Sequence, residues 1–225
     1  MELIISDDVR ERFSPIIGLI RASDIDNATS YDEVGSLLED AAAQARDQLG
    51  ACDSPQQHPL LAAWRQAYRE FGSNPKSYRC SAEALARRAI QGDELPRIGT
   101  LVDLYNVVSL RHLLPIGGED ASAIDGDLEL ALACGDEPFV RLNGTENEPP
   151  EPGEVIYRDG LGTICRRWNW READRTKLTG RTTAAVLVID GIDPADASAV
   201  ETATTELAAL IERFCGGSCA VEILR

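Results

Sequence analysis

Lysine, histidine and long apolar runs are all scarce in this sequence of 225 residues. The only lysines are Lys76 and Lys177, and the only histidines are His58 and His112. No run approaches the roughly 18 apolar residues needed to span a bilayer. Residues 1–8 also lack the basic start and the apolar stretch of a signal peptide. We therefore expect a cytoplasmic protein without a membrane partner.

The shortage of histidine also limits metal sites. The six cysteines are Cys52, Cys80, Cys134, Cys165, Cys215 and Cys219. Only Cys215 and Cys219 form a close pair, and without a second pair a zinc site has too few ligands. Five of the cysteines lie in or beside apolar or helical stretches, as small buried residues do. We expect no metal, no cofactor and, in a reducing compartment, no disulfide.

Positive charge is scarce as well, because 38 acids face 22 bases and give a formal net charge of −16. Attraction to phosphate dominates affinity for nucleic acids, so this acidity argues against a generic nucleic-acid binder. The charge is uneven, however: residues 166–181 carry six bases against two acids, a balance of +4. Such a segment can hold a polyanion locally. A solvated acidic surface in a salt-adapted organism is the alternative.

The chain does have what a core requires, with 44% hydrophobic residues and no linker rich in proline, glycine or serine. Helical spacing of apolar residues predicts helices at residues 30–50, 60–71, 81–92, 100–113 and 195–214. Short apolar runs predict strands at residues 1–6, 16–22, 128–133, 139–142, 154–157, 163–166, 184–189 and 221–224. This order predicts one α+β domain over residues 1–225, with a mixed β-sheet and flanking helices.

Three local features complete this prediction. Ser81 is a suitable N-cap for the third helix. Residues 184–189 form an apolar run that suits a central buried strand. Residues 143–152 are polar and rich in proline, and we expect them to form a surface loop without a catalytic role.

Three sequence blocks occur in a recognisable order. The first runs from Trp64 to Leu85, the second from Asp103 to Asp120, and the third from Gly153 through Cys165–Arg171 to Thr183. The ordered set resembles freestanding relatives of the B-three/B-four domain, the editing and tRNA-binding domain of the phenylalanyl-tRNA synthetase β subunit. The likeness covers roughly residues 60 to 190 by motif and the whole chain by architecture.

This resemblance implies a pocket between a sheet and helices. In the synthetase, that pocket hydrolyses tyrosine wrongly esterified to the phenylalanine tRNA. Such a site must hold an ester carbonyl, polarise it and place a water molecule. Positioning and electrostatic stabilisation can supply most of this effect without a protein nucleophile, so we assign no catalytic residue.

The sequence departs from the synthetase pattern at two places. The synthetase turn Pro-x-His-x-x-Asp is here Pro115–Asp120, with Gly117 at the histidine position. The synthetase Gly-Gly-Glu segment is here Trp168–Glu172, and whether Glu172 takes the place of that glutamate is open. We therefore expect a rebuilt pocket that does not edit tyrosine.

Two segments are the main candidates for substrate binding. Gly117 and Gly118 allow close approach of a ligand and offer backbone N–H donors, with Asp120 beside them to accept from an amino group. A tight turn in which Asp120 bonds its own backbone is the alternative.

The second candidate segment is Arg167–Arg171, where a strand would place Trp168 and Trp170 on one face as an aromatic platform. Arg167, Asn169 and Arg171 would then lie on the other face, for phosphate or carboxylate. A core-packing tryptophan pair is the alternative.

Other candidates have weaker patterns. Asn106 and Ser109 share a helix face, and Thr182 can place a hydroxyl group near a ligand; structural roles explain all three equally well. For RNA binding we select the basic residues near these segments, namely Lys76, Arg79, Arg166, Arg175 and Lys177.

The leading functional hypothesis is a module that binds aminoacyl-tRNA and deacylates a mischarged one in trans. The alternative is a non-catalytic module for a free amino acid or a similar small anionic ligand. Both depend on one geometric expectation, that Gly117–Gly118 and Trp168–Trp170 line the same cavity.

Overall fold

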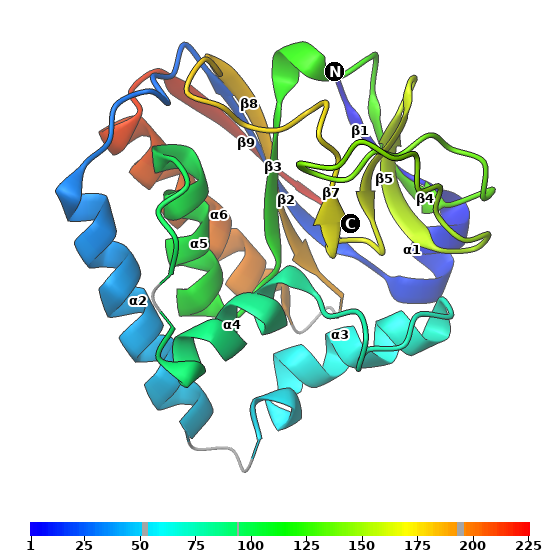
Figure 1. Ribbon diagram of the computed structural model, residues 1–225, viewed down its shortest axis with the longest axis horizontal. Coiled ribbons are helices and arrows are strands. Elements are labelled where there is room, and N and C mark those ends of the chain that lie inside the picture. The colour runs from blue at the N-terminus through cyan, green and yellow to red at the C-terminus, as the bar shows by residue number, and fades with distance from the viewer. Residues whose placement is uncertain (51–53, 94, 193–195) are drawn as a thin grey trace.

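Two β-sheets lie side by side in the computed structural model, with helices beside the second sheet and below both (Figure 1). The structure describes residues 1–50, 54–93, 95–192 and 196–225. Two predictions concern residues outside this set: the buried environment expected for cysteines, at Cys52, and the helix start expected at Ala195. In the described part of the chain, no helix is long and apolar enough to cross a membrane.

The first sheet has five strands in the order β1-β4-β5-β6-β7. Their bounds are β1 Leu3–Ile5, β4 Leu128–Leu132, β5 Val155–Asp159, β6 Gly162–Arg166 and β7 Arg171–Glu172. Strand β1 is parallel to β4, and the other neighbours are antiparallel, so this sheet is mixed. The pairing of β1 ties the N-terminal residues to a sheet built from the middle of the chain.

The second sheet has four antiparallel strands in the order β3-β8-β2-β9. Their bounds are β3 Ile116–Asp120, β8 Ala184–Gly191, β2 Ile16–Ser23 and β9 Ser218–Leu224. Strand β8 lies between two neighbours, which confirms the prediction of a central strand from its apolar run. Strand β3 lies at the edge, and this edge faces the first sheet (Figure 1).

In the part of the chain that the structure describes, six α-helices pack around the sheets: α1 Asp7–Phe13, α2 Asp32–Gly50, α3 Pro59–Glu70, α4 Ser81–Gln91, α5 Thr100–His112 and α6 Ala197–Phe214. Helices α5 and α6 contact the second sheet, and α2 packs on α5. Five of these helices were expected from apolar spacing. Helix α1 was missed because its seven residues hold only two buried side chains, Val9 and Phe13, too few to show a period.

Three local predictions were wrong. Residues 139–142 form only isolated bridges, at Val140 and Arg141, because a loop rather than a neighbouring strand lies beside them. Residues 116–120, which fell within a predicted turn, form strand β3 by pairing with β8. Cys80 rather than Ser81 caps helix α4, because the Cys80 sulfur accepts the backbone N–H of Glu83.

The buried apolar residues form two core clusters, of which the first joins the first sheet to helices α1 to α5 and to residues of β2 and β8. Trp64 and Trp168 meet edge to face at 5.0 Å in the first cluster, and both are fully buried. The second cluster joins α5 and α6 to β2 and β8. The chain is thus an α+β domain with flanking helices, as predicted, although its strands divide between one mixed and one antiparallel sheet.

Candidate functional site

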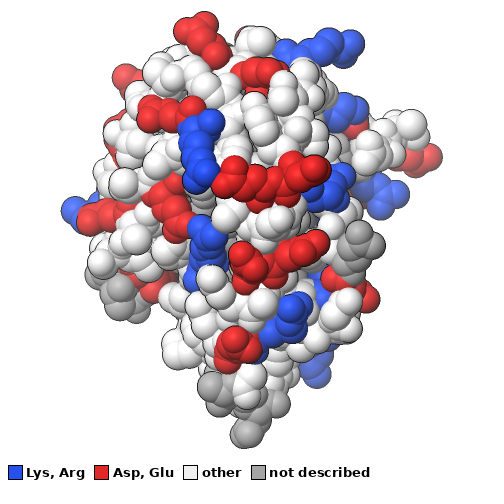
Figure 2. All heavy atoms as spheres, turned by 90° about the vertical axis from the view of Figure 1, so that its left-hand side faces the viewer, with Lys and Arg blue, Asp and Glu red and all other residues white. Residues whose placement is uncertain are grey.

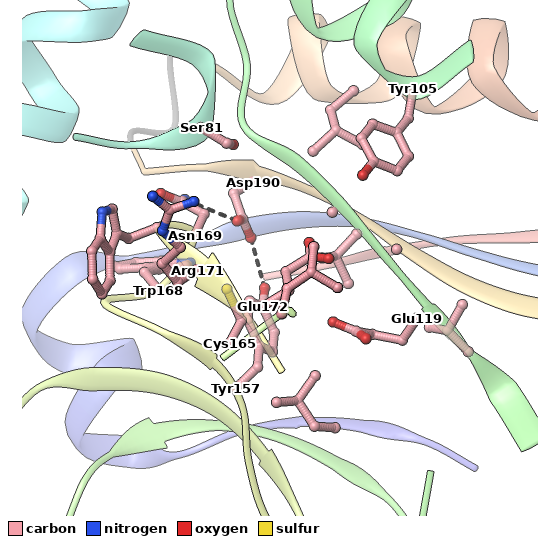
Figure 3. Close-up of a pocket in the computed structure, with 18 of the residues that line it drawn as sticks. Ser81, Tyr105, Glu119, Tyr157, Cys165, Trp168, Asn169, Arg171, Glu172 and Asp190 are labelled. Carbon is pink, nitrogen blue, oxygen red and sulfur yellow. Dashed lines mark hydrogen bonds between the residues drawn. The ribbon is translucent and has the colours of Figure 1, made fainter. Parts of the chain in front are cut away.

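A cavity of about 220 Å³ lies where the two sheets meet under helix α5 (Figure 3). Strands β3 and β8 form one wall, and β6, β7 and the turn between them form another. Helix α5 contributes Tyr105 and Asn106. Apolar side chains make up much of the surface, namely Ile116, Leu128, Ile164, Val186 and Val188. The cavity therefore combines apolar walls with a small number of polar groups, as ligand sites commonly do.

Gly117 leaves room on the wall of strand β3. A Cβ atom at this position would lie 2.7 Å from Oε1 of Glu172, closer than such atoms approach. At Gly118 a Cβ atom would instead meet Leu178 and Leu187, at 3.2 and 3.3 Å. The Glu172 carboxyl group therefore occupies the space in which a side chain at position 117 would lie.

Asp190 is the best-anchored carboxylate of the cavity. It is 1% exposed and lies on β8. Tyr157 donates its hydroxyl to one oxygen at 2.6 Å, and the Asn169 amide donates to the other at 3.0 Å (Figure 3). Burial raises the pKa of Asp190 to about 6, while these hydrogen bonds act in the opposite direction. Two donors hold this group in place and leave lone pairs free for a ligand.

Glu119 and Glu172 form a second acidic group, on β3 and β7. Burial raises the pKa of Glu172 to about 7, opposed by the backbone N–H of Gly118. Burial and then the nearby Glu172 carboxylate raise the pKa of Glu119 well above its ordinary value. Among the described residues, Oε2 of Glu119 is buried without a hydrogen-bond partner. A buried polar atom without a partner is costly, and it is satisfied when a ligand donates to it.

The segment from Arg167 to Trp170 is a turn, so the predicted strand with two faces is wrong. Arg167 and Trp168 both have positive φ, at 48° and 66°, which turns their side chains away from strand alternation. Trp168 packs in the core against Phe13 and Trp64 while its edge reaches the cavity. Trp170 packs edge to face on Tyr78 instead. The two indoles therefore form no shared platform.

Arg167 stacks between the rings of Tyr78 and Trp170, with its Cζ at 3.7 and 4.8 Å from their centroids. Arg171 is exposed, and its Cζ lies 5.4 Å from the Trp170 ring. This aromatic and arginine cluster lies beside the cavity wall formed by Trp170 and Arg171. Of the two arginines, only Arg171 lines the cavity.

Most predicted substrate-binding residues come together. Seven line the cavity: Asn106, Gly117, Gly118, Trp168, Asn169, Trp170 and Arg171. Four do not line it: Ser109, Asp120, Arg167 and Thr182. Ser109 donates to the Leu114 carbonyl at 2.7 Å, and Thr182 donates to Asp120 at 2.6 Å. Asp120 also accepts from Ser122, which is the backbone-capping role considered as the alternative.

The basic residues selected for RNA binding are mostly paired with acids. Arg166 binds both oxygens of Glu154, at 3.0 and 2.9 Å, and is itself buried. Arg175 pairs with Asp159, Lys177 with Asp174 and Arg79 with Glu83. Lys76 is exposed. On the face shown in Figure 2, lysines and arginines lie among acids rather than in one continuous patch. Glu154 and Asp159, from outside residues 166–181, therefore neutralise part of the local +4 balance of this segment.

Sequence reasoning missed the acids of the cavity, Glu119 and Asp190, and left Glu172 open. A signal for Asp190 exists, because it directly follows the apolar run of a central strand. Glu119 lies in a segment that we interpreted as a turn, so no sequence pattern predicted that its side chain is buried. Tyr157 and Tyr105 were also missed as cavity residues.

One group of side chains in the described residues has the spacing of a metal site: Cys134, Asp136 and Glu137. The Glu137 oxygens accept the backbone N–H groups of Cys134 and Gly135, at 2.7 and 2.9 Å. These bonds identify the group as a capped turn. The described cysteines are free, including Cys215 and Cys219.

The fold and the site together define an α+β domain with an acidic cavity between its two sheets. The sequence matches the B3/4 domain family over residues 63–216, and the chain belongs to this family. A solved structure with a similar fold is an N-terminal fragment of the phenylalanyl-tRNA synthetase β subunit from Pyrococcus horikoshii, with a TM-score of 0.51 and 9% identity. The match covers all of this chain and 54% of that chain, so this chain spans about half of the fragment. The search of curated proteins found no match to this sequence.

Proposed function

We propose that this protein binds the aminoacyl end of a charged tRNA in the cavity and hydrolyses the ester in trans. One observation carries the proposal: the charged side chains in the described cavity wall are three carboxylates, Glu119, Glu172 and Asp190, and one arginine, Arg171. The likeness to a tRNA synthetase domain supports a tRNA-related role. It supplies no substrate identity.

The charge of the wall favours an esterified amino acid over a free one. Both have an α-ammonium group, which binds well to a buried carboxylate such as Asp190. A free amino acid also brings a carboxylate, which the acidic wall repels. In an ester this charge is absent. The exposed Arg171 then lies suitably for a phosphate of the terminal nucleotides.

The proposed reaction is hydrolysis of the aminoacyl ester by one water molecule. The oxygen of a water molecule forms a bond to the ester carbonyl carbon, and the bond from that carbon to the ribose oxygen breaks. One water proton passes to the ribose oxygen, and the amino acid leaves as a carboxylate with release of the remaining proton. Fixing the ammonium group at Asp190 holds the ester in one orientation, and orientation alone can account for much of the rate.

The proposed functional unit includes the residues that precede the family match. The family match starts at residue 63, but β1 and β2 pair with β4 and β8 inside it. We propose that residues 1–225 form one functional unit. A charged tRNA as substrate would place the protein in the cytoplasm.

Purified protein incubated with a panel of aminoacyl-tRNAs tests the activity. We expect at least one member to lose its amino acid tenfold or more faster than in buffer. Asp190→Asn should lower kcat/KM at least tenfold, because it removes the charge that fixes the ammonium group. The control Glu33→Gln removes an exposed carboxylate of α2 and should have no effect. Melting temperatures of both variants show whether they fold.

A rate equal to buffer across the panel would overturn the enzyme proposal. The ion pairs of Arg79, Arg166, Arg175 and Lys177 favour the second candidate, a module that binds a small ligand without RNA. That candidate is supported if an amino acid raises the melting temperature while tRNA gives no gel shift at low salt.

A further inference from the structure

We propose that the acyl group bound in this cavity has a cationic side chain, an amine or a guanidine, held by Glu119 and Glu172. This inference rests on the proposed function and adds the substrate class. It depends on the number of carboxylates, their placement and the lack of an ion pair between the two glutamates and any described lysine or arginine.

The number of carboxylates exceeds what an ordinary aminoacyl group needs. An esterified amino acid with a neutral side chain has one charged group, its α-ammonium. Asp190, oriented by Tyr157 and Asn169, is sufficient to bind it. Glu119 and Glu172 then remain in the same cavity without an ion-pair partner among the described residues, and burying uncompensated charge is costly.

The two glutamates lie near one another in the cavity. Glu119 comes from β3, and Glu172 comes from β7 and reaches Gly117 of β3. Figure 3 shows Glu119 and Glu172 directed into the cavity, on the side away from Asn169. An extended side chain whose α-ammonium is at Asp190 therefore points toward this pair.

Among the described residues, no lysine or arginine forms an ion pair with either glutamate. The neutral or acidic groups around the pair are Tyr105 of α5, Cys165 of β6 and Asp190 of β8. Near Glu119 lie also the Thr176 hydroxyl, the Asp159 carboxylate and the Arg175 guanidinium, which lowers the pKa of Glu119. Arg171 stacks on Trp170 at the exposed side, and Arg175 pairs with Asp159. Burial raises the pKa of both glutamates, and the Glu172 carboxylate raises that of Glu119 further, so each keeps a proton more readily than an exposed carboxyl group does. A ligand cation can replace that proton.

The size and lining of the cavity fit such a group. Its volume of about 220 Å³ is below the roughly 300–1,000 Å³ typical of sites for drug-sized ligands, so it suits a single amino acid. Ile116, Ile164 and Val188 provide apolar contact for the methylene groups of a lysine-like side chain.

Calorimetry with amino acid amides tests this inference. An amide keeps the α-ammonium group and, like an ester, has no carboxylate. Lysinamide and argininamide are compared with norleucinamide, which matches lysinamide in length but lacks the side-chain charge. We expect a cationic amide to bind at least tenfold more tightly than norleucinamide. Because the ligand replaces a proton, its affinity should rise as the pH increases from 5.5 to 7.5.

Variants of the cavity carboxylates show which of them cause the preference for cationic amides. Glu119→Gln and Glu172→Gln should each reduce the preference for the cationic amide by fivefold or more. Asp190→Asn should weaken all amides, and Glu33→Gln should change none. Melting curves of each variant exclude misfolding as the cause.

The outcomes separate the two proposals. If norleucinamide binds as tightly as both cationic amides, the inference on the side chain is overturned while aminoacyl binding stands. If the preference survives both glutamine variants, the assignment to Glu119 and Glu172 is wrong. If no amide binds and no aminoacyl-tRNA is hydrolysed, both proposals fail together.

Discussion

At the scale of single residues, the pKa of the Glu172 carboxyl group links the cavity to stability. Its value of about 7 in the folded chain lies above the ordinary 4.5 of the unfolded chain. The folded chain thus keeps a proton that the unfolded chain releases, so stability falls as the pH rises from 4.5 through 7. Above that range the loss is complete.

Glu172→Gln should remove this loss. The measured quantity is the free energy of unfolding of the variant minus that of the parent protein. We expect this difference to be about 1–3 kcal/mol more favourable to the variant at pH 8 than at pH 4. Urea unfolding at pH 4, 6 and 8 measures it. An unchanged difference between the two proteins at all three values would show that the carboxyl group titrates as in water.

A second prediction at this scale concerns the tryptophans. Trp168 is fully buried between Phe13 and Trp64, so Trp168→Ala should cost about 3–5 kcal/mol. Trp170 is only half-buried against Tyr78, and Trp170→Ala should cost clearly less. Denaturant titration of both variants checks the order. Equal costs would contradict the assignment of Trp168 to the core.

At the scale of elements, strand β3 decides how the cavity is built. Gly117→Ala should change the free energy of unfolding by less than about 1 kcal/mol, because only the far end of the Glu172 side chain must move. It should still lower the affinity for lysinamide, since the carboxyl group is displaced. Glu33→Gln is the control, because it changes an exposed carboxylate of α2 that pairs with Arg213 outside the cavity. Calorimetry in which both variants retain parental affinity would contradict this role of Gly117.

The elements also show what sequence alone can predict. Helices α2 to α6 were found because apolar periodicity is local to each helix. Strand β3 was missed because pairing with β8 makes it a strand, and pairing partners are not visible in a Pro-Ile-Gly-Gly stretch. Likewise, the positive φ angles at Arg167 and Trp168 reflect burial of the indole, not local preference. The cavity was predicted to include both segments, whereas its acids could not be distinguished among 38 acidic residues.

At the scale of the whole molecule, charge pairing limits how tRNA can bind. Most selected basic side chains already have acidic partners, which leaves Lys76 and Arg171 as the exposed candidates. Each phosphate contact to a single strand contributes about −0.7 to the slope of log affinity against log salt. We expect a slope no steeper than about −2, from fluorescence anisotropy between 50 and 200 mM salt. A slope steeper than about −5 would reveal an extended phosphate interface and contradict this view.

The position of β2 has a consequence for biosynthesis. Ile17 lies opposite Asp190 on one side and Leu224 on the other, so both neighbours of this apolar strand leave the ribosome long after it does. Such distant pairings slow folding, and an unpaired apolar strand is prone to aggregation meanwhile. During translation the nascent chain must therefore keep β2 shielded, by early helices or by a chaperone, until the last strands emerge.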